Sequence, residues 1–123
     1  MSYDSSNVFA RILRGEIPCK KIAEDAYFLA FHTIAPHAPI HGLVIPTGAF
    51  TDAHDFHKNA NADEIVGFYK GVAQVVDLLG VYDTGFRQIS NCGVNGGQEV
   101  PHYHIHILGG RKLGPMVSGV IAE

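Results

Sequence analysis

The stretch PHYHIHILGG, residues 101–110, places His102, His104 and His106 at every second position and then ends in two glycines. Alternate residues of a β-strand face the same side of a sheet, so this spacing predicts a strand over about 103–108 with the three imidazoles on one face. The residues between them, which would face the core, are Tyr103, Ile105 and Ile107. One short segment therefore predicts both a core strand and a cluster of titratable side chains.

Three interpretations of the histidine row are open. The row could be an exposed polar face on an edge strand. It could bind a metal ion, although three ligands on one straight strand converge poorly on one ion and His41 would have to assist from a neighbouring strand. It could also perform nucleophilic catalysis on phosphorus, because neutral imidazole is a nucleophile and the glycine-rich segment 92–98 lets backbone amides approach an anion. The third interpretation uses both the histidines and the loop.

The rest of the chain predicts an α+β fold, a five-stranded antiparallel meander sheet with two helices. Asn61 and Glu64 resemble a capping box ahead of the longer helix, and Gly80 would end that helix. The helices are expected at 8–13 and 62–79, and the strands at 22–24, 27–32, 42–46, 85–91 and 103–108. Residues 1–123 should form one domain, with 1–6 and about 114–123 as loosely ordered tails.

Composition excludes several classes of protein. The 123 residues suit one domain, and 46% hydrophobic residues are ordinary for a globular chain. A net charge of −3 does not favour binding to nucleic acid or to an anionic membrane. No apolar run approaches the ~20 residues of a membrane helix. Cys19 and Cys92 form no paired framework, which favours reduced thiols and a cytoplasmic location.

Three blocks of sequence resemble the histidine triad (HIT) superfamily, and within it the Hint-like branch. They are VFARILRGEIPCKKIAED at 8–25, LAFHTIAPHAPIHGLVIP at 29–46 and ISNCGVNGGQEVPHYHIHILGG at 89–110. The resemblance implies a HIT-like fold that pairs as a homodimer with a ten-stranded sheet. It also implies binding of purine nucleotides such as AMP and GMP, hydrolysis of adenosine phosphoramidates, and no need for a metal or another cofactor.

The resemblance also assigns roles to individual residues. His104 would be the nucleophile that becomes nucleotidyl-histidine, His102 would orient it, and His106 would contact a phosphate oxygen or the leaving group. His41 would be the fourth histidine of the site. The nucleotide-binding residues would be Asn91, Gly97 and Gln98 beside the phosphate, and Val8, Phe9, Ile12, Ile17, Ile34 and Leu43 around the base. Packing in the core is the alternative for the last six.

Two positions depart from the family pattern. Thr33 stands where the family has an Asp that holds the ribose hydroxyls, and a hydroxyl cannot accept two charge-assisted hydrogen bonds as a carboxylate can. Thr33 is therefore predicted to give weaker ribose recognition. Glu99 introduces an acidic group beside the phosphate loop, and it would repel phosphate unless it turns away.

Two other functions compete with phosphoramidate hydrolysis. A Fhit-like dinucleoside polyphosphate hydrolase would share the histidine row, but the N-terminal block and the ILGGR segment at 107–111 argue against that branch. A nucleotide-binding interaction protein with incidental turnover would use the same residues, and the sequence does not separate it from an enzyme.

Overall fold

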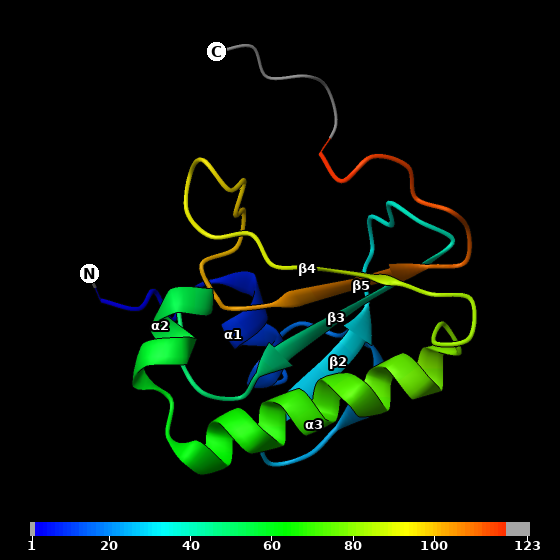
Figure 1. Cartoon of the computed structure of the whole chain (residues 1–123). Coiled ribbons are helices and arrows are strands. Elements are labelled where there is room, and N and C mark those ends of the chain that lie inside the picture. Colours follow the sequence, from blue (N-terminus) through cyan, green and yellow to red (C-terminus); the bar gives the residue numbers. More distant parts are fainter. Residues whose placement is uncertain (1, 118–123) are drawn as a thin grey trace.

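The computed structural model describes residues 2–117. Within this range the chain forms a five-stranded antiparallel sheet (Figure 1), which confirms the predicted fold class. The strands are β1 (Lys20–Glu24), β2 (Phe28–His32), β3 (Ile40–Pro46), β4 (Arg87–Ile89) and β5 (Ile105–Gly109).

The strand order is β1-β2-β3-β5-β4, which departs from a simple meander at the last two strands. Two helices separate β3 from β4 in the chain, so no tight turn forces these strands to pair. β5 occupies the position between them, with His106 opposite Leu43 of β3 on one side and Ile89 of β4 on the other. The strand that ends the histidine row is therefore an interior strand.

The helix α3 (Ala62–Leu79) covers one face of the sheet (Figure 1) and has the bounds that the sequence predicts. Asn61 accepts from the backbone N–H of Glu64, and the Glu64 carboxylate accepts from the N–H of Asn61, so the capping box is present. Gly80 adopts a left-handed conformation with φ of 67° and ends the helix. The core between helix and sheet includes Phe28, Ala30, Val44, Phe68, Val72, Val75, Tyr103, Ile105 and Ile107.

The opposite face of the sheet carries a smaller apolar cluster. Its buried members are Phe9, Leu29, Phe31, Leu43 and Ile45, of which Phe9 belongs to the predicted helix α1 (Val8–Leu13). Neighbouring residues of β2 thus serve opposite faces, as the period of a strand requires. The six residues of α1 leave part of this face uncovered, and the pocket described below lies there.

A third helix, α2 (Ala53–Asn59), corrects the prediction of two helices. Asp52 caps it by accepting from the N–H of Asp55 at 2.8 Å. The helix buries a single side chain, Phe56, so it offers no repeating apolar stripe by which the sequence could reveal it.

Hydrogen bonds involve residues near both ends of the described chain, and the expectation of loosely ordered tails stays a prediction. Tyr3 contacts His102, and the guanidinium of Arg87 donates to the carbonyls of Gly114 and Pro115. The expectation for 118–123 lies outside the described residues. Among residues 2–117, no helix has the length and apolar character needed to cross a membrane.

Candidate active site

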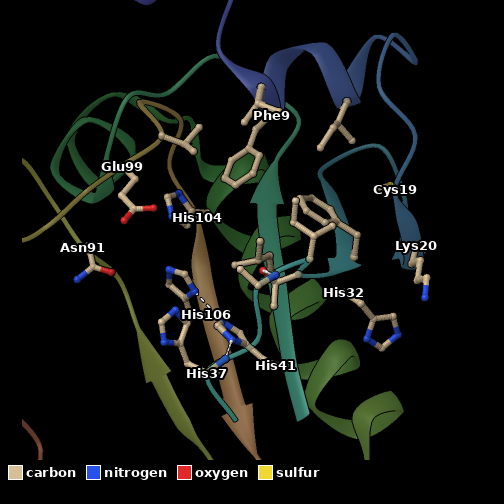
Figure 2. Close-up of a pocket in the computed structure, with 18 of the residues that line it drawn as sticks. Phe9, Cys19, Lys20, His32, His37, His41, Asn91, Glu99, His104 and His106 are labelled. Atoms are coloured by element: carbon tan, nitrogen blue, oxygen red, sulfur yellow. Dashed lines mark hydrogen bonds between the residues drawn. The ribbon is translucent and has the colours of Figure 1, made fainter. Parts of the chain in front are cut away.

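A pocket of about 1180 Å³ lies between α1, the adjacent face of β2, β3 and β5, and the loops before β3 and β5. Figure 2 shows polar side chains at its two ends, with apolar walls between them. One end carries His37, His41, Asn91, Glu99, His104 and His106, and the other carries Lys20 and His32. The size and the convergence of polar groups are those of a small-molecule site.

His104 is buried in the wall of this pocket, with 6% of its surface exposed. Its Nδ1 lies 2.7 Å from the carbonyl oxygen of His102, and because a carbonyl can only accept, Nδ1 carries the proton. The ring of Phe9 packs edge-on against the imidazole, with centroids 5.0 Å apart. Nε2 is then the unprotonated nitrogen of a fixed ring, which is the form that a nucleophile needs.

Two further histidines form a directed hydrogen-bond chain (Figure 2). The backbone N–H of His37 donates to Nδ1 of His41 at 3.0 Å, so the proton of a neutral His41 is on Nε2. That Nε2 lies 2.9 Å from Nδ1 of His106 and donates to it. The proton of His106 is therefore on its own Nε2, and His106 lines the pocket as a hydrogen-bond donor.

Burial keeps these imidazoles neutral near pH 7. Burial and the neighbouring imidazoles lower the pKa of His106 to about 4. Burial lowers the pKa of His104, while its bond to the His102 carbonyl and the charge of Glu99 act in the opposite direction. Burial also lowers the pKa of His41.

His102 is completely buried and does not line the pocket. Its Nε2 donates to the carbonyl of Pro46 at 2.9 Å, and its Nδ1 lies 2.6 Å from the hydroxyl of Tyr3. Burial, opposed by the bond to Pro46, lowers the pKa of His102 to about 4. Both ring nitrogens are thus occupied by the protein, and its carbonyl holds His104.

The geometry excludes one of the three interpretations of the histidine row. An exposed polar face on an edge strand is wrong, because His102 and His104 are buried and β5 is interior. The row is also not one straight strand, since β5 begins at Ile105 and leaves the first two histidines in the preceding loop. Across residues 2–117, the His, Cys, Asp and Glu side chains form no group of three that could hold a metal ion.

The predicted phosphate loop reaches the pocket through two of its three residues. Asn91 and Gly97 line it, and the Asn91 amide donates to the carbonyl of Gly96 at 2.6 Å. Gly97 has a φ of +77°, a conformation that favours glycine. The side chain of Gln98 instead ties the loop to the body of the protein, and its contacts are the carbonyls of Thr51 and Val100 and the N–H of Gly93.

The six residues predicted around the base all line the pocket: Val8, Phe9, Ile12, Ile17, Ile34 and Leu43. Phe9 and Leu43 are also buried members of the apolar cluster, so these two side chains both pack in the core and form part of the pocket wall. Ile34 is fully exposed at the rim and Val8 is 38% exposed.

The two departures from the family pattern also lie at this pocket. The Thr33 hydroxyl lines it and accepts from the N–H of Ala35 at 3.2 Å, which leaves its proton as a donor. Glu99 lines it as well, and its carboxylate lies on the same side of the pocket as His104 (Figure 2).

Three contributors escaped the sequence analysis, namely Tyr3, the backbone N–H of His37 and the carbonyl of Pro46. A lone tyrosine near a chain end has no spacing that links it to residue 102. Backbone groups carry no side-chain identity and leave no pattern in a sequence. Tertiary contact alone places them beside the histidines.

Comparison with known proteins defines the family. The HIT domain model matches residues 14–113. A HIT-like protein of Azospirillum brasilense, itself uncharacterized, is 54% identical over 95% of this chain and 96% of its own. The purine nucleoside phosphoramidase of Escherichia coli is 38% identical over 90% of this chain and 92% of its own. This chain therefore belongs to the HIT domain family.

The fold agrees with that membership. The solved structure of a HIT family hydrolase from Clostridium thermocellum superimposes with a TM-score of 0.80. It is 35% identical and the match covers 93% of this chain and 98% of that one. The five-stranded sheet and its helices are thus the HIT fold.

Proposed function

We propose that this protein is a purine nucleotide-binding hydrolase that cleaves the P–N bond of nucleoside phosphoramidates through a nucleotidyl-histidine intermediate on His104. The observation that carries the proposal is the state of His104, a neutral ring held at Nδ1 by the His102 carbonyl with Nε2 left to the pocket. The relative named purine nucleoside phosphoramidase supports the choice of substrate class.

The first half-reaction transfers the nucleotidyl group to the enzyme. Nε2 of His104 attacks phosphorus and forms an N–P bond while the substrate P–N bond breaks. The Nε2–H of His106, held in that tautomer by His41, donates a hydrogen bond to the leaving nitrogen, which takes its proton from solvent and departs as a neutral amine. The ring of His104 becomes positively charged, and the His102 carbonyl stabilises that charge through Nδ1–H.

The second half-reaction returns the enzyme to its starting state. Water attacks the phosphorus and releases one proton to solvent, while the Nε2–H of His106 donates a hydrogen bond to a phosphoryl oxygen. The bond between phosphorus and His104 breaks, so the nucleoside monophosphate and a neutral His104 are released. The same hydrogen-bond chain through His41 serves both steps, because it keeps Nε2 of His106 as a donor toward the reacting group.

The walls of the pocket suit the rest of a nucleotide. The apolar side chains of Phe9, Ile12 and Leu43 form a wall against which a flat base would pack. Thr33 would donate one hydrogen bond to the ribose where the family has a carboxylate. Gly97 gives the backbone close access to phosphate oxygens beside Asn91.

The side of the pocket beyond His104 and His106 favours an amine over a polyphosphate as leaving group. Asn91 and Glu99 lie there, away from Lys20 at the other end (Figure 2). Among the described residues that line the pocket, Glu99 is the one carboxylate, and it would repel the anionic leaving group of a dinucleoside polyphosphate. An amine is neutral or cationic and meets no such repulsion. This charge weighs against the Fhit-like alternative.

The decisive experiment uses His104→Ala. It should abolish turnover of an adenosine phosphoramidate while AMP still binds, because the base wall is unchanged. Rates on diadenosine triphosphate measured in parallel should be far lower than on the phosphoramidate. Turnover that survives in His104→Ala would refute the covalent mechanism, and activity lost on chelation would instead favour a metal site.

An enzyme and a nucleotide-binding interaction protein are distinguished by asking whether the biological effect depends on turnover. If His104→Ala retains nucleotide binding and also retains the biological effect of the wild type, then turnover is incidental. If the effect is lost with turnover, the hydrolase proposal stands.

The proposal includes a homodimer and a cytoplasmic location. β4 is an edge strand of the sheet, and Val66 and Leu78 of α3 are each 58% exposed, so both surfaces are available to a second copy. Both Cys19 and Cys92 are free thiols, as expected in a reducing compartment. Light scattering during size-exclusion chromatography at micromolar concentration would distinguish a dimer from a monomer.

A further inference from the structure

Among residues 2–117, His102 is the one buried histidine that does not line the pocket, and the hydroxyl of Tyr3 is hydrogen-bonded to its ring. The oxygen lies 2.6 Å from Nδ1 of His102, and the two rings meet edge to face with centroids 5.7 Å apart. Because Nε2 of His102 donates to the Pro46 carbonyl, a neutral ring has an acceptor at Nδ1. Tyr3 is therefore the donor, and its hydroxyl proton is directed at His102.

Asn7 fixes the direction of that proton. Its Nδ2 donates to the Tyr3 oxygen at 2.9 Å and to the Asp4 carbonyl at 2.7 Å. Its Oδ1 accepts from the N–H of Ala10, so the amide orientation is set by the cap of α1. An N–H already occupies the acceptor side of the Tyr3 oxygen, and the hydroxyl proton is left for His102.

The path continues from His102 to the reacting atom. The ring of His102 is held between Tyr3 and Pro46, and the backbone of the same residue presents the carbonyl that accepts from Nδ1 of His104 at 2.7 Å. We propose that Tyr3 is a positioning residue, which through His102 holds the imidazole of His104 in line for attack. The inference rests on the proposed role of His104 as nucleophile.

Loss of the hydroxyl has a specific expected consequence. Tyr3→Phe leaves Nδ1 of His102 without a donor inside a completely buried site, which disfavours the observed ring position. A shift of His102 moves its carbonyl and therefore His104, and small misalignments of a reacting group are costly. We expect kcat to fall roughly 10-fold or more. KM should change little, since Tyr3 does not line the pocket.

The test is a double-mutant cycle on an adenosine phosphoramidate with wild type, Tyr3→Phe, His102→Ala and the double variant. If Tyr3 acts through His102, Tyr3→Phe lowers kcat in the wild type and causes no further loss in the His102→Ala background. Tyr82→Phe removes the hydroxyl of a tyrosine that is 71% exposed and serves as the matched control. A wild-type kcat in Tyr3→Phe, or the same loss in both backgrounds, would overturn the inference.

Asn7→Asp tests the same path without removing the tyrosine. The carboxylate keeps the cap of α1 but offers an acceptor to the Tyr3 hydroxyl, which then competes with His102 for the proton. We expect a loss of kcat similar to that of Tyr3→Phe, and an unchanged kcat in a folded Asn7→Asp protein contradicts the inference. Turnover in His104→Ala would instead show that the proposed function has failed, so the two failures are distinguishable.

Discussion

The two ends of the histidine row, His102 and His106, differ in what holds them. Burial lowers the pKa of each to about 4, and each lies two residues from His104. The protein occupies both nitrogens of His102, through Tyr3 and Pro46. It occupies only Nδ1 of His106 and leaves Nε2 to the pocket.

The difference teaches that neutrality alone does not define a catalytic histidine. A neutral imidazole with both nitrogens bonded inside the protein can fix the backbone but cannot exchange a proton with a substrate. One with a single bonded nitrogen can offer its other nitrogen to a substrate, and the partner at the bonded nitrogen decides which atom carries the proton. His102 is therefore expected to contribute mainly to stability and alignment, and His106 mainly to chemistry.

The largest expected effect is a loss of catalytic activity, and it should distinguish His106 from His102. His106→Ala should lower kcat for an alkyl phosphoramidate by about 10²- to 10⁴-fold, because it removes the donor to the leaving amine. Its melting temperature should stay near that of the wild type, since the side chain borders an open pocket. His54→Ala, on exposed α2, is the control for loss of an imidazole. Equal kcat values for His106→Ala and His54→Ala would contradict the catalytic role of His106.

The reverse experiment concerns stability. His102→Ala removes a completely buried ring and leaves the Pro46 carbonyl and the Tyr3 hydroxyl without their partner. We expect the free energy of unfolding to fall by about 3–5 kcal/mol, from the cavity and the lost hydrogen bonds together. Urea unfolding of His102→Ala beside His106→Ala measures the contrast, which disappears if both variants lose the same amount.

Acid should unfold the protein partly through His102. Its pKa is about 4 in the folded state against 6.5 in the unfolded chain, so the unfolded state binds more protons between these values. Stability is complete above pH 6.5 and falls by about 3 kcal/mol as the pH drops to 4. His102→Gln cannot titrate, so its unfolding free energy should depend less on pH over this range. Parallel pH profiles for the two proteins would reject this assignment.

The smallest effect concerns the acid limb of activity. Burial lowers the pKa of His104, so activity should persist below pH 6.5, and the charge of Glu99 opposes this shift. Glu99→Gln removes that charge, and the acid limb should move to lower pH, by a small amount because the carboxylate is exposed to solvent. Asp83→Asn, an exposed acid outside the pocket, should leave the limb in place. A limb that moves to higher pH would show the opposite sign of coupling.

Local signals predicted the regular elements well. The bounds of α1 and α3 and the core positions Tyr103, Ile105 and Ile107 follow from helical spacing, caps and strand alternation. α2 escaped because it buries one side chain. The strand order escaped because β3 and β4 are joined by helices, and no local rule fixes which neighbour such a strand chooses.

The residues of the candidate site were likewise predicted only in part from the sequence. A family motif places His41, His104 and His106 together, and the structure brings them into one pocket. The same reasoning placed Gln98 against the ligand, whereas its amide is bonded to the loop and to Thr51. A motif records which residue occurs at a position, and it does not record which way the side chain turns.

By itself the sequence determined that this chain has three alternate histidines that lead into a strand, a glycine-bearing loop before them and the blocks of the HIT family, because each of these depends on residues close in the chain. Only the tertiary structure decided which nitrogen of each histidine carries a proton. The carbonyl of His102 sets the proton of His104, whereas the Pro46 carbonyl sets that of His102, and the N–H of His37 sets that of His106 through His41. Pro46 and His37 lie far from residues 102–106 in sequence. A hydrogen bond acts over about 3 Å of space and is indifferent to separation along the chain.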